Sequence, residues 1–184
     1  MDKKKAHLSN FYTKQLVVTA LFTALCAVST YVIVIPLPYG YFNAGDIFVL
    51  LAGWCLGPLY GSLASAVGSS LADIFSGYPI YAPATFLIKG AVTVVAYFIC
   101  KMIKHWITKE KRDYIPRILS AVVAEAVMVI GYFIFESILY GLAGGSLGLL
   151  GNTLQGLICV IGGALLFSIV YTVKPIRNFF PLLN

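Results

Sequence analysis

Charged residues are scarce in this sequence. Only 11% of its 184 residues are Asp, Glu, Lys or Arg, whereas 60% are hydrophobic and the mean hydropathy is +0.90. An ordinary soluble domain carries about 25% charged residues, because its surface must be covered with groups that water solvates. The composition therefore excludes an ordinary soluble fold and predicts an integral membrane protein.

Short motifs for common chemistry are also lacking. The sequence contains no GxxxxGK[ST] loop for ATP phosphates and no HExxH, GxSxG or clustered acidic motif. Its four cysteines, Cys26, Cys55, Cys100 and Cys159, lie in different apolar stretches without paired spacing, which indicates neither disulfides nor a zinc site. We therefore expect no enzymatic activity, no bound metal or cofactor, and packing roles for the cysteines.

Long apolar stretches are abundant. Four of them, near residues 15–35, 85–103, 118–139 and 150–173, are long enough to cross a hydrocarbon core of about 30 Å at about 1.5 Å per residue. Residues 46–76 are apolar as well, but Gly57, Pro58 and Gly61 interrupt them in the run LGPLYG. This stretch fits either one broken helix or two short helices, 46–58 and 61–76.

The thirteen Lys and Arg residues decide between these alternatives. Four precede the first span, six lie in residues 101–117, two follow the last span, and Lys89 alone lies inside a span. Basic residues accumulate on the cytoplasmic side, and two crossings over residues 46–76 place all three clusters there. We predict an all-α membrane protein, a six-transmembrane-helix bundle with both termini cytoplasmic, forming a single domain over residues 1–184. Topology then explains the net charge of +6, and no nucleic-acid binding is expected.

Polar side chains collect at the outer end of this predicted bundle. Lys89 and Glu136 fall about one turn below the outer surface, and ionisable residues at this depth are costly unless they serve a function. Asn152 and Gln155 share one face of the last helix, and Asp46 and Asp73 lie at outer helix ends. With nearby aromatic residues, this arrangement predicts a pocket that opens outward. The predicted substrate-binding residues are Phe42, Asn43, Asp46, Tyr78, Tyr81, Lys89, Tyr132, Glu136, Asn152 and Gln155.

Structural roles for the same groups are the alternative. Lys89 and Glu136 could neutralise each other, and the amides could join helices. Glu125 lies three turns before Glu136, about 16 Å away on the same face, which is too distant for a catalytic pair. Glu125 could join a polar network, carry a proton or bond a neighbouring backbone, and we favour the network.

Small residues form two stripes at helical spacing. Ala20 and Ala24 lie in TALFTALCA, and Ala64, Gly68 and Ala72 lie in the third predicted span. Such stripes let helices approach closely in lipid. One stripe can serve internal packing, so we expect the other to receive a partner.

The runs NAGDIFVLLAGWCLGPLYG (residues 43–61) and GSSLADIFSGYPIYAPATFLIKG (residues 68–90) resemble the S components of energy-coupling factor (ECF) vitamin transporters. The resemblance implies a subunit of the bacterial plasma membrane that captures a small-molecule vitamin outside the cell. It implies association with a transmembrane coupling protein and two ATPases, which use the ATP that this chain does not bind. It also implies that Ala20 and Ala24 contact the coupling protein, that residues 36–45 act as a gate, and that the subunit topples to carry its pocket inward.

The resemblance also bears on which vitamin is bound. The same runs are closest to members that handle pyridoxine (vitamin B6) or hydroxymethylpyrimidine, and riboflavin and pantothenate members are similar. A neutral hydroxylated heteroaromatic could bond Glu136, Asn152 and Gln155, whereas the carboxylate of pantothenate would meet Lys89. Pairing of Lys89 with an acid favours a neutral ligand. The alternative class is a secondary transporter coupled to protons through Glu125 or Glu136, but the two halves of the sequence show no inverted repeat.

Overall fold

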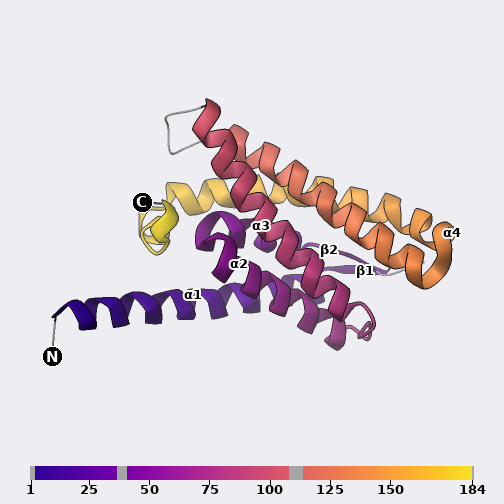
Figure 1. The fold of residues 1–184 in the computed structure, drawn as a ribbon, viewed down its shortest axis with the longest axis horizontal. Helices are drawn as coiled ribbons and strands as arrows, with labels where there is room; N and C mark the ends of the chain where they lie inside the picture. Colours follow the sequence, from indigo (N-terminus) through magenta and orange to yellow (C-terminus); the bar gives the residue numbers. More distant parts are fainter. Residues whose placement is uncertain (1–2, 37–40, 108–113, 184) are drawn as a thin grey trace.

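The computed structural model describes residues 3–36, 41–107 and 114–183, nearly all of them helical (Figure 1). Four of its helices are long and apolar enough to cross a membrane: α1, α2, α3 and α4. In chain order the elements are α1 (Lys3–Val32), β1 (Val34–Pro36), β2 (Tyr41–Asn43), α2 (Asp46–Phe75), α3 (Ala82–Ile107), α4 (Tyr114–Thr172), α5 (Lys174–Arg177) and the 3-10 helix η1 (Pro181–Leu183).

Helix α2 is broken at Gly57, where φ is +83° and ψ is −174°. This conformation strongly favours glycine, and Pro58, which follows, cannot donate a helical hydrogen bond. The two halves of α2 pack closely beside the break, since a Cβ on Gly61 would lie 2.6 Å from the carbonyl oxygen of Ala52. The backbone therefore leaves helical geometry at the hinge that the sequence suggests.

Helix α4 is broken at Gly141, where φ is +76° and ψ is 170°, and its second half runs back along the first (Figure 1). The fifth predicted span ends at residue 139 and the sixth begins at residue 150, but residues 142–149 between them are helical as well. Small residues make the tight return possible. A Cβ on Gly145 would lie 2.9 Å from the carbonyl oxygen of Phe133, so the two halves nearly touch through backbone.

A short antiparallel hairpin, β1 and β2, follows α1, with Val34 opposite Asn43 and Pro36 opposite Tyr41. The sequence suggested that the first span continues to residue 35, but α1 ends at Val32 and residues 34–36 are a strand. Residues 37–40, the middle of the expected gate, lie outside the described residues. Because alternate residues of a strand share a face, Tyr41 and Asn43 point to the same side of the hairpin.

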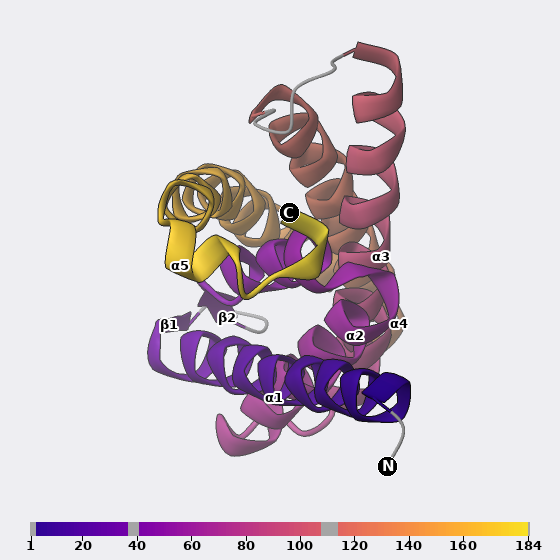
Figure 2. The ribbon, with the colours of Figure 1, turned by 90° about the vertical axis from the view of Figure 1, so that its left-hand side faces the viewer.

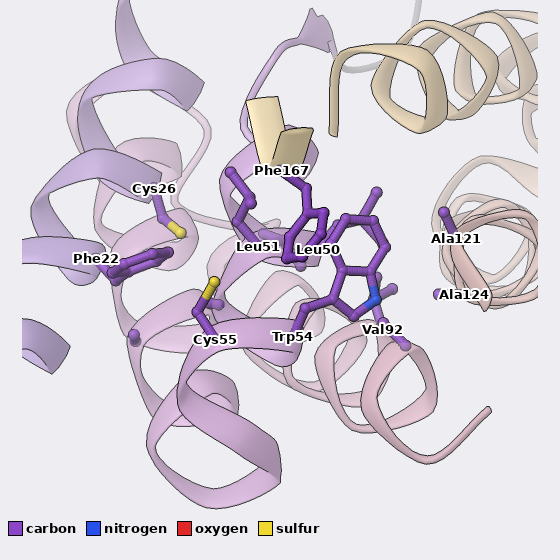
Figure 3. Close-up of a cluster of buried hydrophobic side chains, with 14 of the residues drawn as sticks. Phe22, Cys26, Leu50, Leu51, Trp54, Cys55, Val92, Ala121, Ala124 and Phe167 are labelled. Carbon is purple, nitrogen blue, oxygen red and sulfur yellow. The ribbon is translucent and has the colours of Figure 1, made fainter. Parts of the chain in front are cut away.

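The apolar core lies where α1, α2, α3 and α4 meet (Figure 3). All four cysteines are free and buried, in agreement with packing roles. Both chain termini lie at one end of the bundle, the end that faces the viewer in Figure 2. The labelled core residues of Figure 3 are Phe22, Cys26, Leu50, Leu51, Trp54, Cys55, Val92, Ala121, Ala124 and Phe167.

The two small-residue stripes differ in their surroundings. Gly68 of α2 faces α1, and a Cβ there would lie 2.4 Å from the carbonyl oxygen of Thr23. This stripe serves internal packing. Ala20 and Ala24 of α1 are exposed, so the second stripe lies on the outside of the bundle.

Candidate substrate-binding site

The hairpin and the turn of α4 lie at the end of the bundle remote from the termini (Figure 1). Residues of β2, of both halves of α4 and of the segments beside the α2–α3 connection line a cavity. Its free volume is only about 20 Å³, which is room for about one water molecule. Its lining residues are Tyr41, Asn43, Asp73, Tyr81, Tyr132, Glu136, Asn152 and Gln155.

Polar atoms in the wall of this cavity lack partners. Among the described residues, Asp73 Oδ2, Tyr81 Oη, Glu136 Oε2 and Asn152 Nδ2 have no hydrogen-bond partner although they are buried. A buried polar group without a partner costs about 1–3 kcal/mol, and native proteins keep few of them. Four such atoms therefore lie around one cavity.

An ion pair lies beneath the cavity. Lys89 Nζ of α3 donates to Asp46 Oδ1 at 2.6 Å and to Asp46 Oδ2 at 2.8 Å, and the two side chains are 1% and 0% exposed. Asp46 is the first residue of α2, where a carboxylate also complements the helix dipole. The charge of Lys89 is thus compensated by Asp46, and the alternative in which Lys89 pairs with Glu136 is wrong.

Gln155 of α4 connects this ion pair to the hairpin. Its Nε2 donates to Asp46 Oδ2 at 2.6 Å, and its Oε1 accepts a hydrogen bond from the backbone nitrogen of Asn43 at 2.9 Å. The Asn43 side chain accepts a further bond from the backbone nitrogen of Gly45 at 2.9 Å. One buried chain of hydrogen bonds therefore joins α3, α2, α4 and β2.

Tyrosines surround the hairpin side of the cavity. Tyr41 donates a hydrogen bond to Asp73 Oδ1, and its ring centroid lies 5.1 Å from that of Tyr78. Burial raises the pKa of the Tyr41 phenol well above its ordinary value, and the neighbouring Asp73 raises that pKa further. Burial likewise raises the pKa of Tyr81. Both phenols therefore keep their protons at neutral pH and can donate hydrogen bonds.

Glu136 and Gly148 face each other across the turn of α4. A Cβ on Gly148 would lie 1.9 Å from Glu136 Oε2, so this carboxylate position requires glycine opposite. The neighbouring Tyr132 hydroxyl shares a hydrogen bond of 2.9 Å with Thr85 Oγ1 of α3, which fixes the ring. Lys89 Nζ lies 5.3 Å from the centroid of this ring. The acidic side of the cavity is thus held by α3 and by both halves of α4.

The predicted site residues fall into two groups. Asp46 and Lys89 form the ion pair beneath the cavity, Tyr78 packs behind Tyr41, and Phe42 is not part of the lining. Their direct contact with substrate stays a prediction, as it does for the residues that line the cavity. Those lining residues are Asn43, Tyr81, Tyr132, Glu136, Asn152 and Gln155.

Tyr41 and Asp73 also line the cavity, although neither is in the predicted set. Recognition of residues 34–36 and 41–43 as paired strands would have placed Tyr41 on the same face as Asn43, and Phe42 on the opposite face. Asp73 carries its own signal, because it is an acidic residue at the end of an otherwise apolar stretch.

Glu125 stands apart from this network. Its side chain is 4% exposed, and neither carboxylate oxygen has a hydrogen-bond partner among the described residues. The described residues thus give no support to the favoured network role, and Lys89 and Gln155 are bound to Asp46.

The bundle of apolar helices has a small polar cavity at one end, and several polar atoms of its wall lack hydrogen-bond partners. These features are typical of a membrane protein that binds a small polar molecule. The model of the family described as "ECF-type riboflavin transporter, S component" matches residues 10–172. An uncharacterised protein of Pyrococcus woesei is 35% identical over 152 residues, which cover 81% of this chain and 97% of that protein. The solved structure presented as "Structure and mechanism of the S component of a bacterial ECF transporter" has a TM-score of 0.70 at 25% identity, covering 88% of this chain and 97% of that chain.

This chain belongs to the family of S components of ECF-type riboflavin transporters. It is a multi-pass protein of the bacterial plasma membrane and the substrate-binding subunit of a transporter, and its family is not a class of enzymes. S components bind a vitamin and work with an ECF module of membrane and ATPase subunits.

Proposed function

We propose that this S component captures riboflavin from outside the cell in the cavity between the hairpin and α4. The main support is the set of buried polar atoms without partners in the cavity wall, including Glu136 Oε2 and Asn152 Nδ2. The flavin ring offers carbonyl oxygens and an imide N–H, and its ribityl chain offers hydroxyl groups. Glu136 and Asn152 together present both an acceptor and a donor for such groups, and the family model names riboflavin.

Pyridoxine and hydroxymethylpyrimidine are the competing ligands, because the runs at residues 43–61 and 68–90 resemble members that handle them. Both are neutral heteroaromatics with hydroxyl groups, and both would meet the same donors and acceptors. Pantothenate is disfavoured by the ion pair. Lys89 is bound to Asp46, and no Lys or Arg is among the residues that line the cavity, so the carboxylate of pantothenate would lack a cation there.

The proposed topology has six crossings with both termini cytoplasmic. It is supported by the breaks at Gly57 and Gly141, which divide two of the four candidate spans. The ends of α3 and α1 that carry basic residues lie at the same end of the bundle as the termini, and the cavity lies at the other end (Figure 1). Cytoplasmic placement of the basic end makes the cavity face outward.

The proposed partners are a transmembrane coupling protein, which docks on the exposed stripe of Ala20 and Ala24, and two ATPases that supply the energy. The hairpin is the proposed gate, since β2 contributes Tyr41 and Asn43 to the cavity wall. Toppling of the occupied subunit would then carry the cavity inward. This chain itself would bind no cofactor.

Mass spectrometry of the small molecule released from the purified protein tests the substrate directly. Riboflavin in stoichiometric amount supports the proposal, and a B6 vitamer or a pyrimidine in its place overturns it. Uptake assays in vesicles test whether the protein needs partner subunits or is a secondary transporter. Vesicles that contain this chain alone and a proton gradient should not accumulate the vitamin, whereas uptake would favour a secondary transporter that uses Glu125 or Glu136.

A further inference from the structure

A second cavity lies between the two halves of α4, on the outside of the bundle. Its volume is about 270 Å³, and it shares no lining residue with the vitamin cavity. Apart from Glu125 and Thr153, its walls are apolar or glycine, and they include Val122, Ala126, Val129, Gly156 and Leu157. We call this space the α4 cleft.

The α4 cleft opens toward the lipid. Val122, Ile130 and Leu157 on its walls are 49%, 57% and 57% exposed. In a protein of the plasma membrane, exposed apolar side chains of a spanning helix contact hydrocarbon. An occupant of the cleft would therefore enter sideways from the bilayer.

Glu125 places a carboxyl group in the wall of the cleft, and none of the described residues forms a hydrogen bond to it. Both of its oxygens are without a partner, and the side chain is 4% exposed. The hydroxyl of Thr153, the other polar group of the wall, donates to the carbonyl oxygen of Leu149 at 2.7 Å. A buried carboxyl group without a partner is costly in apolar surroundings. Binding of a molecule that donates a hydrogen bond to Glu125 would therefore be strongly favoured.

We propose that the α4 cleft binds a membrane-dissolved amphiphile that has an apolar body and a hydroxyl group, and that this hydroxyl bonds to Glu125. A hydroxyl fits better than an ammonium group, because an isolated charge is far more costly than a hydroxyl to bring into hydrocarbon. The apolar body would lie against Val122, Val129 and Leu157. This site depends on the membrane location of the chain and not on the identity of the vitamin.

Infrared difference spectroscopy of the full chain in lipid nanodiscs tests the site. The probes are 1-dodecanol, dodecane as the apolar control, and dodecylamine as the cationic comparison. We expect 1-dodecanol to produce a difference band in the carboxyl region that is absent from E125Q, and dodecane to produce none. Ala126→Phe fills the cleft without changing Glu125, and it should abolish the band.

The competing outcomes are distinct. The site is overturned if 1-dodecanol gives no Glu125 band, if dodecane gives the same band, or if the band survives in Ala126→Phe. A band with dodecylamine but not with 1-dodecanol overturns the assignment to a hydroxyl. Vitamin binding measured on the same samples should change less than twofold in Ala126→Phe, which shows that the protein is folded and separates this test from that of the vitamin site.

Discussion

Lys89 Nζ of α3 lies 2.6 Å from Asp46 Oδ1 of α2, and both side chains are almost completely removed from solvent. Gln155 adds α4 to this contact through a bond of 2.6 Å to Asp46 Oδ2. Two opposite charges buried together are tolerated, whereas one left alone is strongly destabilising. The pair therefore fixes the relative positions of three helices directly below the vitamin cavity.

This relationship predicts non-additive effects in a double-mutant cycle. Asp46→Asn and Lys89→Met should each lower the free energy of unfolding by about 3–5 kcal/mol, because each leaves one buried charge without its partner. The double variant should lose much less than the sum of the two. Denaturation of the purified protein in detergent measures these differences, and additive losses would show that the two charges do not stabilise each other.

The sequence was sufficient to locate Lys89 inside a span and Asp46 at the outer end of another, but not to pair them. They are 43 positions apart, and Glu136 lies at a similar predicted depth. The choice between the two acids depends on how each helix is rotated about its axis. Hydropathy and charge placement fix the depth of a residue in the membrane and leave this rotation undetermined.

The hairpin and the turn of α4 escaped prediction for different reasons. Each strand has only three residues, which is too short for an alternating pattern to emerge, although this pattern is what separates Tyr41 from Phe42. In α4 the chain reverses at a single residue with positive φ, Gly141. The glycines at 144, 145 and 148 lie between two predicted spans, whereas in the structure they are helical and permit close packing.

Removal of polar groups from the cavity wall should weaken vitamin binding. Glu136→Gln and Asn152→Ala each change a polar side chain in the cavity wall, and each should raise the Kd at least tenfold, about 1.4 kcal/mol. Calorimetric titration with the vitamin that mass spectrometry identifies measures this change in Kd. Ser146→Ala is the matched control in α4, because Ser146 is exposed and its hydroxyl donates to the carbonyl oxygen of Leu142. Unchanged affinity in both cavity variants would move the site elsewhere.

Gly148→Ala should displace the carboxylate of Glu136, although alanine is a better helix former than glycine. The new methyl group would lie 1.9 Å from Glu136 Oε2, so the carboxylate must move and the Kd should rise at least tenfold. Gly90→Ala in α3 is the control, because its nearest contact would be an ordinary 3.7 Å to Ala66 Cβ. Calorimetric titration of both variants, with unfolding midpoints in parallel, separates loss of binding from loss of folding. Wild-type affinity in Gly148→Ala would mean that Glu136 does not contact the vitamin.

Tyr41 and Phe42 should respond differently to substitution, because they lie on opposite faces of β2. Tyr41→Phe removes the bond to Asp73 and should speed vitamin dissociation about three- to tenfold, whereas Phe42→Leu should change it less than twofold. Burial raises the pKa of Tyr41, so its phenol stays protonated and this residue should cause no loss of affinity between pH 7 and pH 9. Stopped-flow dissociation rates across this pH range test both points. A larger effect of Phe42→Leu would reverse the assigned orientation of the strand.

Ala20→Trp should separate vitamin binding from transport. Ala20 and Ala24 are exposed on α1 and are not among the residues that line the vitamin cavity. A bulky indole there would prevent close approach of a partner helix. The variant should bind the vitamin with wild-type affinity but fail to copurify with the coupling protein or to support uptake in cells. Ile138→Trp is the control for added aromatic surface, since Ile138 is 77% exposed on α4. Normal copurification of the Ala20→Trp variant would place the docking surface on another face of the bundle.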